Sequence, residues 1–312
     1  MTLLDVEHAK GRRHVTAQAS GAGLEIGRRI AGIAEDPVRP GAVLGRKGTM
    51  SVRLAASREE IEASQRLRYE VFYQERSALA DEVMAATGRD QDAFDDICDH
   101  MLVVDSVSGI DQPGLALDGG TVVGTYRLLR QEIAEANRGF YTAGEFDIRP
   151  LIEAKRGTAR FLELGRSCVL KPYRTKPTVE LLWQGIWNYV RLHGHDVMFG
   201  CASLAGVDPR QLALPLSFLH HHCRAPLEWR VGALPERYVE MNLLPAEAVD
   251  MREAMKLLPP LIKGYLRLGA YFGDGAVIDH QFNTTDVLIV LPVSAINERY
   301  FSHFGAPGEI PI

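Results

Sequence analysis

One strand–helix–strand succession in the middle of the chain constrains its fold more than any other feature. The segment ARFLELGRSCVL (159–170) has the composition of a strand. TVELLWQGIWNYVRLHG (178–194) has apolar residues at helical spacing and is closed by Gly194. DVMFGCA (196–202) predicts a second, buried strand. Because strands that alternate with single helices are typical of α/β proteins, the sequence predicts a mixed central sheet flanked by helices.

Segments before this succession extend the pattern. Ser57 and Glu60 in SREE form a capping box, which predicts that a helix follows. HMLVVD (100–105) and TVVGTYRLLR (121–130) predict two strands of a hairpin. A long insertion that ends in the turn DGG at 118–120 joins them.

More elements are expected downstream. Asp208 as N-cap and Pro209 in the first turn predict a helix through LALPLSFLHHH. RYVEMNLL (237–244) and DVLIVLP (286–292) predict strands, with the apolar helix LPPLIKGYLRLG (258–269) between them.

The chain is expected to divide into three parts. Residues 1–49 are rich in Gly, Arg and Ala and predict a flexible arm, within which EDPVRPGAVLGRKG (35–48) predicts a linker. The arm contains eight basic residues against five acidic ones, so it either contacts an anionic partner or is a solvated tail. Residues 50–245 are expected to form the core, and residues 246–312 a helix–strand–helix extension packed on it.

Composition and cysteine spacing exclude several classes of protein. The chain is 46% hydrophobic and 24% charged, which predicts a folded protein, and its net charge of −5 gives no support to nucleic-acid binding. The four cysteines lack CxxC spacing and no secretory signal opens the chain, so we expect a reducing, cytoplasmic location. No apolar run reaches ~18 residues, which argues against a transmembrane helix, whereas peripheral contact with the membrane surface stays open.

An acidic stretch follows the first predicted helix. DQDAFDD and the aspartate after it carry more negative charge than a loop requires, in Asp92, Asp95, Asp96 and Asp99. Repulsion would raise the pKa values of these groups unless cations are close. The candidate cations are Arg68, Arg127 and Arg166, and Arg68 lies one helical turn before Phe72. Such a network either joins the helix to the sheet or forms a functional site.

Glu163 and Arg166 form a second charged pair, in FLELGRS. Residues three apart in a regular strand point to opposite faces, so the pair serves one cleft only if the strand is interrupted. Gly165 is the residue at which a bulge forms most easily. A rim glutamate and a surface arginine are the alternative interpretation.

A basic stretch precedes the central helix. RSCVLKPYRTKPT carries Arg166, Lys171, Arg174 and Lys176 without an acidic residue and leads into the helix at Thr178. A helix N-terminus suits a phosphate, and the lack of a glycine-rich loop favours a single phosphodiester over a wrapped nucleotide. A solvated basic turn is the alternative. No metal site is expected, because neighbouring histidines of HHHC (220–223) point in different directions.

The ordered motifs resemble the acyl-homoserine lactone (autoinducer) synthases, which have the GNAT-type acyltransferase fold. The resemblance rests on RYEVFYQE, DQDAFDD, VVGTYRLL, GEFDI and LELGRS. The positions that match residues recurring in that group are Arg68, Phe72, Asp92, Asp95, Arg127, Phe146, Glu163 and Arg166. Ala78 stands about where the synthases carry a tryptophan.

A closer resemblance, over roughly residues 50–305, is to the ornithine acyl-carrier-protein N-acyltransferases, sometimes labelled hemolysin-like. It rests on LRYEVFYQE, ELGRSCVLKPYR, LLWQGIWNYV, MFGCASLAGVDP and LPPLIKGYLRLGA…DHQFNTTDVLIVLP. It implies a GNAT-like core that moves a 3-hydroxyacyl chain from acyl carrier protein to the α-amino group of L-ornithine, giving lyso-ornithine lipid. It also implies that no cofactor is bound permanently, since the donor is carried on 4'-phosphopantetheine.

The resemblance assigns roles to the candidate residues. Asp92 and Asp95 would bind ammonium, while Arg68, Arg127 or Arg166 would bind the carboxylate or orient the aspartates. Glu163 is the candidate base, directly or through a water, with Arg166 as its catalytic neighbour. The expected acyl pocket and carrier contacts complete the set: Phe72 and Phe146 for the acyl chain, and Lys171, Arg174, Lys176 and Thr178 for the acyl carrier and its phosphopantetheine.

Two other functions stay open. One is acylation of a different amine by the same fold, with glutamine, lysine, glycine or S-adenosylmethionine as acceptor. The other is a non-catalytic membrane-binding protein, which would need LPPLIKGYLRLGAYF as an exposed amphipathic surface, whereas burial of that helix against the sheet is the alternative.

Overall fold

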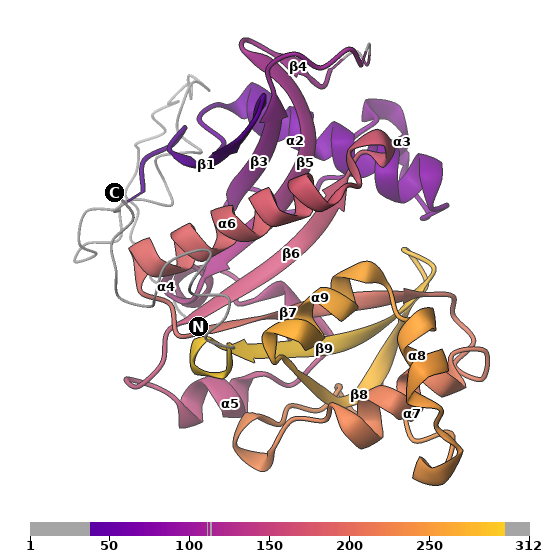
Figure 1. Ribbon diagram of the computed structural model, residues 1–312. Coiled ribbons are helices and arrows are strands. Elements are labelled where there is room, and N and C mark those ends of the chain that lie inside the picture. Colours follow the sequence, from indigo (N-terminus) through magenta and orange to yellow (C-terminus); the bar gives the residue numbers. More distant parts are fainter. Residues whose placement is uncertain (1–37, 111, 113, 297–312) are drawn as a thin grey trace, which may run out of the picture.

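A central mixed sheet organises the chain in the computed structural model, which describes residues 38–110, 112 and 114–296 (Figure 1). The strands, in chain order, are β1 (Val43–Lys47), β2 (Met50–Leu54), β3 (Asp99–Asp105), β4 (Ala116–Leu117), β5 (Gly120–Arg130), β6 (Phe161–Val169), β7 (Val197–Ala205), β8 (Tyr271–Asp279) and β9 (Thr284–Pro292). Their order in the sheet is β1-β2-β3-β5-β6-β7-β9-β8, with β4 paired to β5. The β6–β7 pair is parallel and the other described pairs are antiparallel. The α/β fold with a mixed sheet is confirmed.

Helices cover both faces of this sheet. The α-helices are α2 (Arg58–Tyr69), α3 (Glu82–Thr87), α4 (Gln131–Ala136), α5 (Arg149–Ala154), α6 (Lys176–His193), α7 (Ala213–His222), α8 (Met251–Leu257) and α9 (Pro260–Leu268). A π-helical turn continues α2 as η1 (Glu70–Glu75), and short 3-10 turns include η2 (Tyr141–Gly144) and η3 (Lys171–Tyr173).

Helices α2 and α6 lie on opposite faces. A side chain at Gly185 of α6 would meet Val52 of β2, whereas Arg53, the next residue of β2, pairs with Glu60 of α2 at 2.6 Å. Because neighbouring residues of a strand point to opposite faces, α6 and α2 enclose the sheet between them. Figure 1 shows the same arrangement, with α6 in front of β3 and β5 and α2 behind them.

The two central predictions of local structure are confirmed. Ser57 Oγ accepts the Glu60 amide at 3.3 Å, and Glu60 accepts the Ala56 amide at 2.6 Å, so the predicted capping box opens α2. Gly194 takes the left-handed conformation with φ 64° and ends α6. The strand–helix–strand succession of β6, α6 and β7 follows from these local signals.

Both ends of the predicted core are corrected by the sheet. Val43–Lys47, predicted as part of a linker, forms β1 and pairs with β2. Its backbone groups hydrogen-bond to the free edge of β2, and the Leu44 side chain is buried. Residues 1–37 of the predicted arm lie outside the described residues. The C-terminal segment is part of the central sheet and is not an extension packed on it. Strand β9 pairs along the whole of β7 and with β8 on its other side. After β9 the described residues contain one 3-10 turn, η6 (Val293–Ala295), and the remainder of the predicted final helix lies outside the described residues.

Three local predictions are also wrong. Asp208 caps a turn by accepting the Arg210 amide at 3.1 Å, and the helix starts only at Ala213. RYVEMNLL contributes one isolated bridge, Val239 to Ala276, instead of a strand. Its partner strand β8 was not predicted, because YFGDGAVID contains glycines and aspartates that weaken the strand signal.

Helix α9 is buried against the sheet and α6. Ile262, Tyr265 and Leu268 are 0%, 6% and 8% exposed, and the Tyr265 ring packs edge-on against Trp183 at 5.1 Å. The apolar surface that a membrane-binding function would need is therefore used in the core. Among the described residues, no helix combines the length and apolar character needed to cross a bilayer.

Candidate active site

Three arginines and three aspartates form a buried network between α2 and the sheet. Arg68 of α2 donates to Asp95 through Nη1 at 2.9 Å and Nη2 at 2.8 Å. Its Nε donates to Asp90 at 2.8 Å. Arg127 of β5 donates to Asp92 at 2.6 Å and to Asp95 at 3.2 Å. Helix, loop and strand are thus joined by charge-assisted hydrogen bonds.

Asp90, which was not among the predicted site residues, also belongs to the network and is 0% exposed. Its Oδ1 accepts from Tyr73 at 3.1 Å, and its Oδ2 lies 3.2 Å from Nε of Arg166. Asp90 is the first aspartate of GRDQD (88–92). Nothing in its spacing distinguished it from an ordinary loop residue. Asp96 and Asp99 stand outside the network, since Asp96 is exposed and Asp99 accepts from Tyr189.

Ion pairing sets the charge state of this network. Burial alone would raise the pKa of Asp92, but Arg127 and Arg166 outweigh it and hold the pKa below the ordinary value. The same balance, with Arg68 as the main cation, holds the pKa of Asp95 far below its usual range. Asp92 and Asp95 are therefore ionised, and each is paired with arginines of the network.

A bulge in β6 brings Arg166 to the same site. Thr125 pairs with Cys168 and Arg127 with Gly165, so three steps along β6 oppose two along β5. The interruption expected at Gly165 is thus present, but the left-handed conformation falls on Arg166, with φ 51°. A non-glycine residue in this region is strained, and such residues cluster at functional sites.

The Arg166 guanidinium lies between two aromatic rings. Its central carbon is 4.8 Å from the ring centres of both Tyr141 and Phe282. Nη2 donates to Asp92 at 3.1 Å, while Nε makes no hydrogen bond among the described residues. The Arg166 side chain is 12% exposed and Asp92 22%, so these two form the solvent-facing edge of the network.

Glu163 holds a backbone turn instead of facing solvent. Its Oε2 accepts from the Tyr141 amide at 3.0 Å and its Oε1 from the Thr142 amide at 2.6 Å. Burial raises the pKa of Glu163, and these hydrogen bonds oppose the shift. The structure therefore places Glu163 beneath η2, whose Tyr141 ring contacts Arg166.

Strands β6 and β7 separate beside the bulge. Their parallel register has only three pairs, from Phe161–Val197 to Glu163–Phe199, although each strand continues. Gly200 lies where they part, and a side chain there would come within 2.2 Å of the Leu164 carbonyl oxygen. Figure 1 shows the strands diverging toward the end where α6 begins. The facing edges carry backbone N–H and C=O groups that can pair with an extended ligand.

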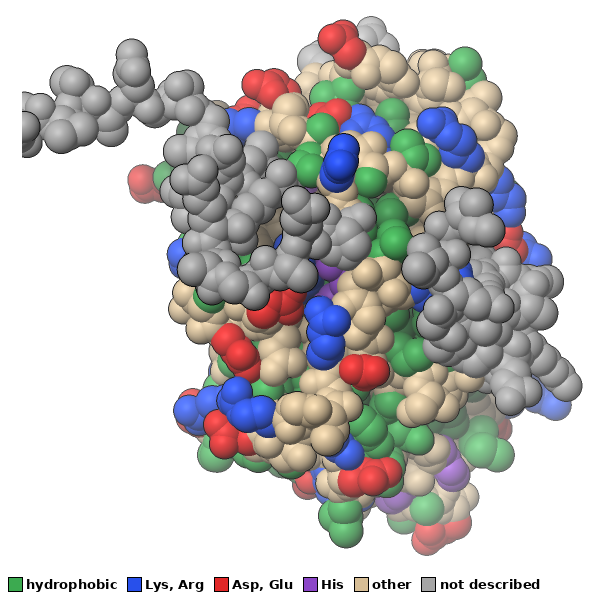
Figure 2. All heavy atoms as spheres, turned by 90° about the vertical axis from the view of Figure 1, so that its left-hand side faces the viewer, with side chains coloured by type: hydrophobic (Ala, Val, Ile, Leu, Met, Phe, Trp, Pro, Cys, Tyr) green, Lys and Arg blue, Asp and Glu red, His purple; other side chains and the backbone are tan. Residues whose placement is uncertain are grey.

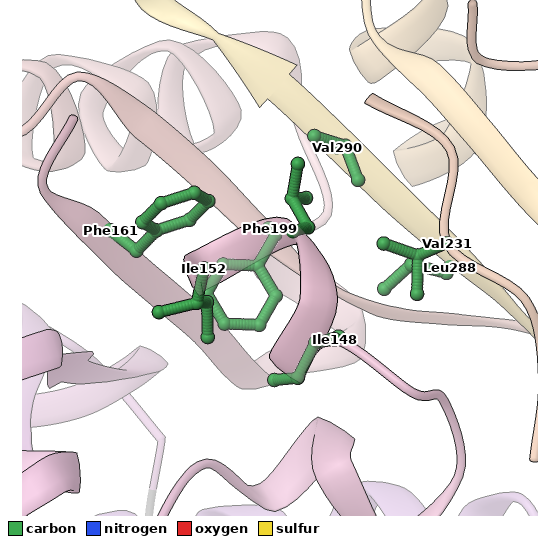
Figure 3. A pocket seen from close by; sticks show the side chains of 8 residues that line it. Ile148, Ile152, Phe161, Phe199, Val231, Leu288 and Val290 are labelled. Carbon is green, nitrogen blue, oxygen red and sulfur yellow. The ribbon is translucent and has the colours of Figure 1, made fainter. Parts of the chain in front are cut away.

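Phe72 and Phe146, predicted to line one acyl pocket, are not brought together. Phe72 packs edge-on against Phe282 at 5.7 Å, whereas Phe146 is fully buried in a different cluster. That second cluster contains an apolar pocket, shown in Figure 3, in which Ile148 and Ile152 face Phe161 and Phe199. The pocket lies on the sheet face that carries Glu163, because Phe161 and Glu163 are two residues apart in β6.

The predicted carrier-binding residues differ in solvent exposure and in the contacts of their side chains. Lys171 and Lys176 are exposed near the start of α6. Arg174 donates to Glu75 at 2.6 Å and to the Val169 carbonyl at 3.0 Å. Thr178 is wrong as a contact residue, since its side chain is 0% exposed and faces Thr175 at 3.2 Å.

His221 and Cys201, whose residue types could suggest metal binding or nucleophilic catalysis, make structural contacts. His221 bonds the Leu244 carbonyl at 2.9 Å. Burial and the neighbouring Glu145 raise the pKa of the Cys201 thiol, which donates to Thr142 at 3.8 Å. Where the structure describes side chains, one group of acids could hold a cation: Glu145, Asp279 and Asp286.

Comparisons with known proteins show what this chain is similar to. A family model described as "Acetyltransferase (GNAT) domain" matches residues 67–184. A protein of Agrobacterium fabrum named "L-ornithine N(alpha)-acyltransferase" is 55% identical over 268 residues, which cover 86% of this chain and 89% of that protein. One of the same name from Brucella abortus is 53% identical, covering 85% of this chain and 92% of the other. Among solved structures, an N-acyl amino acid synthase from uncultured soil microbes aligns with 81% of this chain and 97% of its own, at a TM-score of 0.44 and 11% identity.

Proposed function

Because the chain belongs to the family of L-ornithine N(alpha)-acyltransferases, we propose that it acylates the α-amino group of L-ornithine with a (3-hydroxy)acyl chain from acyl carrier protein. The protein is an acyltransferase of the GNAT fold. The observation that carries the proposal is an identity of 53–55% to three family members over 85–86% of the chain. The product would be lyso-ornithine lipid.

The divergence of β6 and β7 suits the donor. A phosphopantetheine arm contains two amides, which can hydrogen-bond to separated strand edges as an added strand would. The pairing stops after Glu163–Phe199, close to the Arg166 bulge, so a thioester at the end of the arm would lie beside the charged site. The apolar cluster on the same sheet face is closely packed, so it would have to open to take the start of the acyl chain.

Arg166 suits the carboxylate of an amino acid. Its side chain is 12% exposed and lies at the solvent-facing edge of the network, while its buried Nε is ion-paired with Asp90 at 3.2 Å. A guanidinium binds a carboxylate through two parallel N–H bonds. Asp92 already receives hydrogen bonds from Arg127 and Arg166, so we propose that it orients these cations before it binds any ammonium.

The chemistry needs no covalent intermediate. The neutral α-amine attacks the thioester carbonyl, the C–N bond forms and the C–S bond breaks. The amine loses one proton and the departing thiolate gains one. Both oxygens of Glu163 accept backbone amides, so a base role would require it to release one of them. We propose that Glu163 positions η2, and that backbone amides near the bulge stabilise the oxyanion.

The exposed start of α6 suits an acidic carrier protein. Lys171 and Lys176 lie there at the end where β6 and β7 diverge. On the face shown in Figure 2, the visible basic and acidic side chains are intermixed. Electrostatic attraction at the α6 end would speed association with the carrier.

Acceptor panels test this function. Purified protein would receive one acyl donor, on acyl carrier protein or on coenzyme A, with ornithine, lysine, glutamine, glycine or S-adenosylmethionine, and products would be weighed by mass spectrometry. We expect acyl-ornithine from the carrier-bound donor. Reversing charge at Lys171 and Lys176 should raise KM for the carrier several-fold with kcat unchanged, whereas Lys256→Glu on α8 should leave both unchanged. Another preferred amine, or an equal rate with coenzyme A, would contradict the proposal.

A further inference from the structure

Three buried carboxylates meet on the other side of η2. Glu145 follows η2 directly, Asp279 ends β8 and Asp286 lies in β9, and one oxygen of each falls within 4.8 Å of the others. The three residues are 4%, 8% and 7% exposed. We refer to them as the carboxylate trio.

Unlike the arginine–aspartate network, the trio lacks a matching set of cations. Its one close cationic contact among the described residues is Arg237, whose Nη2 lies 3.4 Å from Glu145 Oε1 and whose side chain is 36% exposed. Asp286 accepts from Thr284 at 2.8 Å, and Asp279 accepts the Gln281 and Phe282 amides at 2.8 and 2.9 Å. These donors are neutral, so negative charge is left uncompensated.

Glu145 supplies a second, separate observation. Its Oε2 is buried and makes no hydrogen bond of normal geometry among the described residues. The Cys201 thiol is its nearest donor and lowers the pKa of Glu145, but that thiol also contacts the Thr142 hydroxyl at 3.8 Å. Burial, reinforced by Asp286, raises the pKa of Glu145 to about 7, and burial raises the pKa of Asp286 to about 6. A buried acceptor without a donor costs free energy unless a ligand supplies the donor.

The trio lies next to the charged site. Asp286 is in register with Val277, and Val277 packs in the cluster that contains Phe199, the register partner of Glu163. The Thr142 hydroxyl contacts Cys201 while its amide binds Glu163. On the opposite side, the Phe282 ring contacts Arg166 while its amide binds Asp279. The trio and Arg166 therefore share both the η2 turn and Phe282 as neighbours.

A primary ammonium fits this arrangement. It has three N–H donors, and acceptors at about 2.8–2.9 Å along tetrahedral directions lie roughly 4.6 Å apart, which the trio allows. An amino acid with its carboxylate on Arg166 would extend its side chain past Phe282 toward the trio. We propose that Glu145, Asp279 and Asp286 bind the side-chain ammonium of the acceptor, so that the trio selects diamino acids. This rests on the proposed function and adds the residues that determine acceptor specificity.

Matched acceptors test the proposal. L-Norvaline has the carbon skeleton of L-ornithine without the side-chain amine, so the ratio of kcat/KM for the two measures what the ammonium contributes. We expect Glu145→Gln and Asp286→Asn each to lower kcat/KM for ornithine by roughly 10²-fold and to leave the rate with norvaline unchanged or higher. Asp208→Asn, on an exposed turn, should keep the wild-type ratio.

The outcomes separate this proposal from the function it rests on. If the wild type makes no acyl-ornithine, the proposed function fails. If the wild type makes it and both trio variants fold and keep the wild-type ratio, the trio is not the ammonium site. A loss of ornithine preference on chelation, restored by Mg²⁺ or Ca²⁺, would make the trio a metal site and overturn the proposal. Both variants remove charge that burial disfavours, so unfolding midpoints at or above the wild-type value should verify folding.

Discussion

Arg68 and Asp95 form a two-pronged ion pair, with Nη1–Oδ1 at 2.9 Å and Nη2–Oδ2 at 2.8 Å, at 1% and 4% side-chain exposure. Arg68 also bonds Asp90, so one guanidinium neutralises two buried acids. The pair lies behind the solvent-facing edge formed by Arg166 and Asp92. The Arg68–Asp95 pair therefore supports the site from the core side. The structural interpretation of the charged network applies to this pair, and the functional interpretation applies to Arg166 and Asp92.

Replacement of Arg68 by methionine should strongly destabilise the protein. The substitution keeps much of the side-chain volume but leaves Asp90 and Asp95 buried without their main cation, which costs about 3–5 kcal/mol of unfolding free energy. Urea unfolding measures it. Arg58→Met in the same helix, at a site 82% exposed, is the control and should change stability by less than about 0.5 kcal/mol. A loss for Arg68→Met as small as that of the control would mean that the network adds little to the fold.

Two substitutions of Arg166 should separate the effect of backbone strain on stability from the effect of the guanidinium on catalysis. Arg166→Gly and Arg166→Ala both remove the guanidinium, and both should lower kcat/KM for ornithine by roughly 10²-fold. Glycine accepts a φ of 51° without a Cβ clash, so the glycine variant should be about 1 kcal/mol more stable than the alanine variant. Thermal unfolding and acyl transfer of the two proteins check both parts. Equal stability would show that residue 166 relaxes out of the left-handed region.

Much of the fold was predictable because its signals are local. The capping box at Ser57, the helix end at Gly194 and the apolar runs of β3, β5, β7 and β9 each depend on a few adjacent residues. Strands β1 and β8 were missed because their stability comes from the edges of β2 and β9, which lie elsewhere in the chain. Tertiary pairing overrides weak local preference at such positions.

The charged site shows the same division. Arg68, Asp92, Asp95, Arg127 and Arg166 were identified from charge density and spacing, and the structure brings all five together. Glu145, Asp279 and Asp286 were not identified, since they are separated by up to 141 positions and meet only after β8 and β9 join the sheet. The bulge was anticipated from Gly165, but the left-handed conformation falls on Arg166, whose guanidinium is ion-paired with the distant Asp90.

Glu163→Gln should distinguish positioning from base catalysis. Glutamine has one acceptor oxygen for the two amides that Glu163 now binds, so η2 should shift and turnover should fall by roughly 10²-fold or less. If Glu163 positions η2, the pH profile of the remaining activity should keep its wild-type shape. Loss of the acidic limb of that profile would instead identify Glu163 as the base. Full activity in the variant would remove both roles.

The carboxylate trio should make stability depend on pH in an unusual direction. The folded-state pKa values of Glu145 and Asp286 are raised to about 7 and about 6, from 4.5 and 3.8. A raised pKa means that the stability these groups contribute is fully present below the unfolded values and is lost as pH rises through 6 to 7. Asp92 and Asp95 titrate below this window, because their pKa values are lowered.

The Glu145→Gln/Asp286→Asn double variant tests this pH dependence. Between pH ~5 and pH ~8, the unfolding free energy of the wild type should fall by about 3 kcal/mol relative to the double variant, which has no such groups to ionise. Urea unfolding at both pH values measures the difference, and Asp208→Asn should follow the wild type. Saturating L-ornithine should stabilise the wild type more at the higher pH, because an ammonium favours the ionised trio. Parallel pH dependence in the wild type and the double variant would mean that the trio is already compensated within the folded protein, and would remove the reason for a cation to bind there.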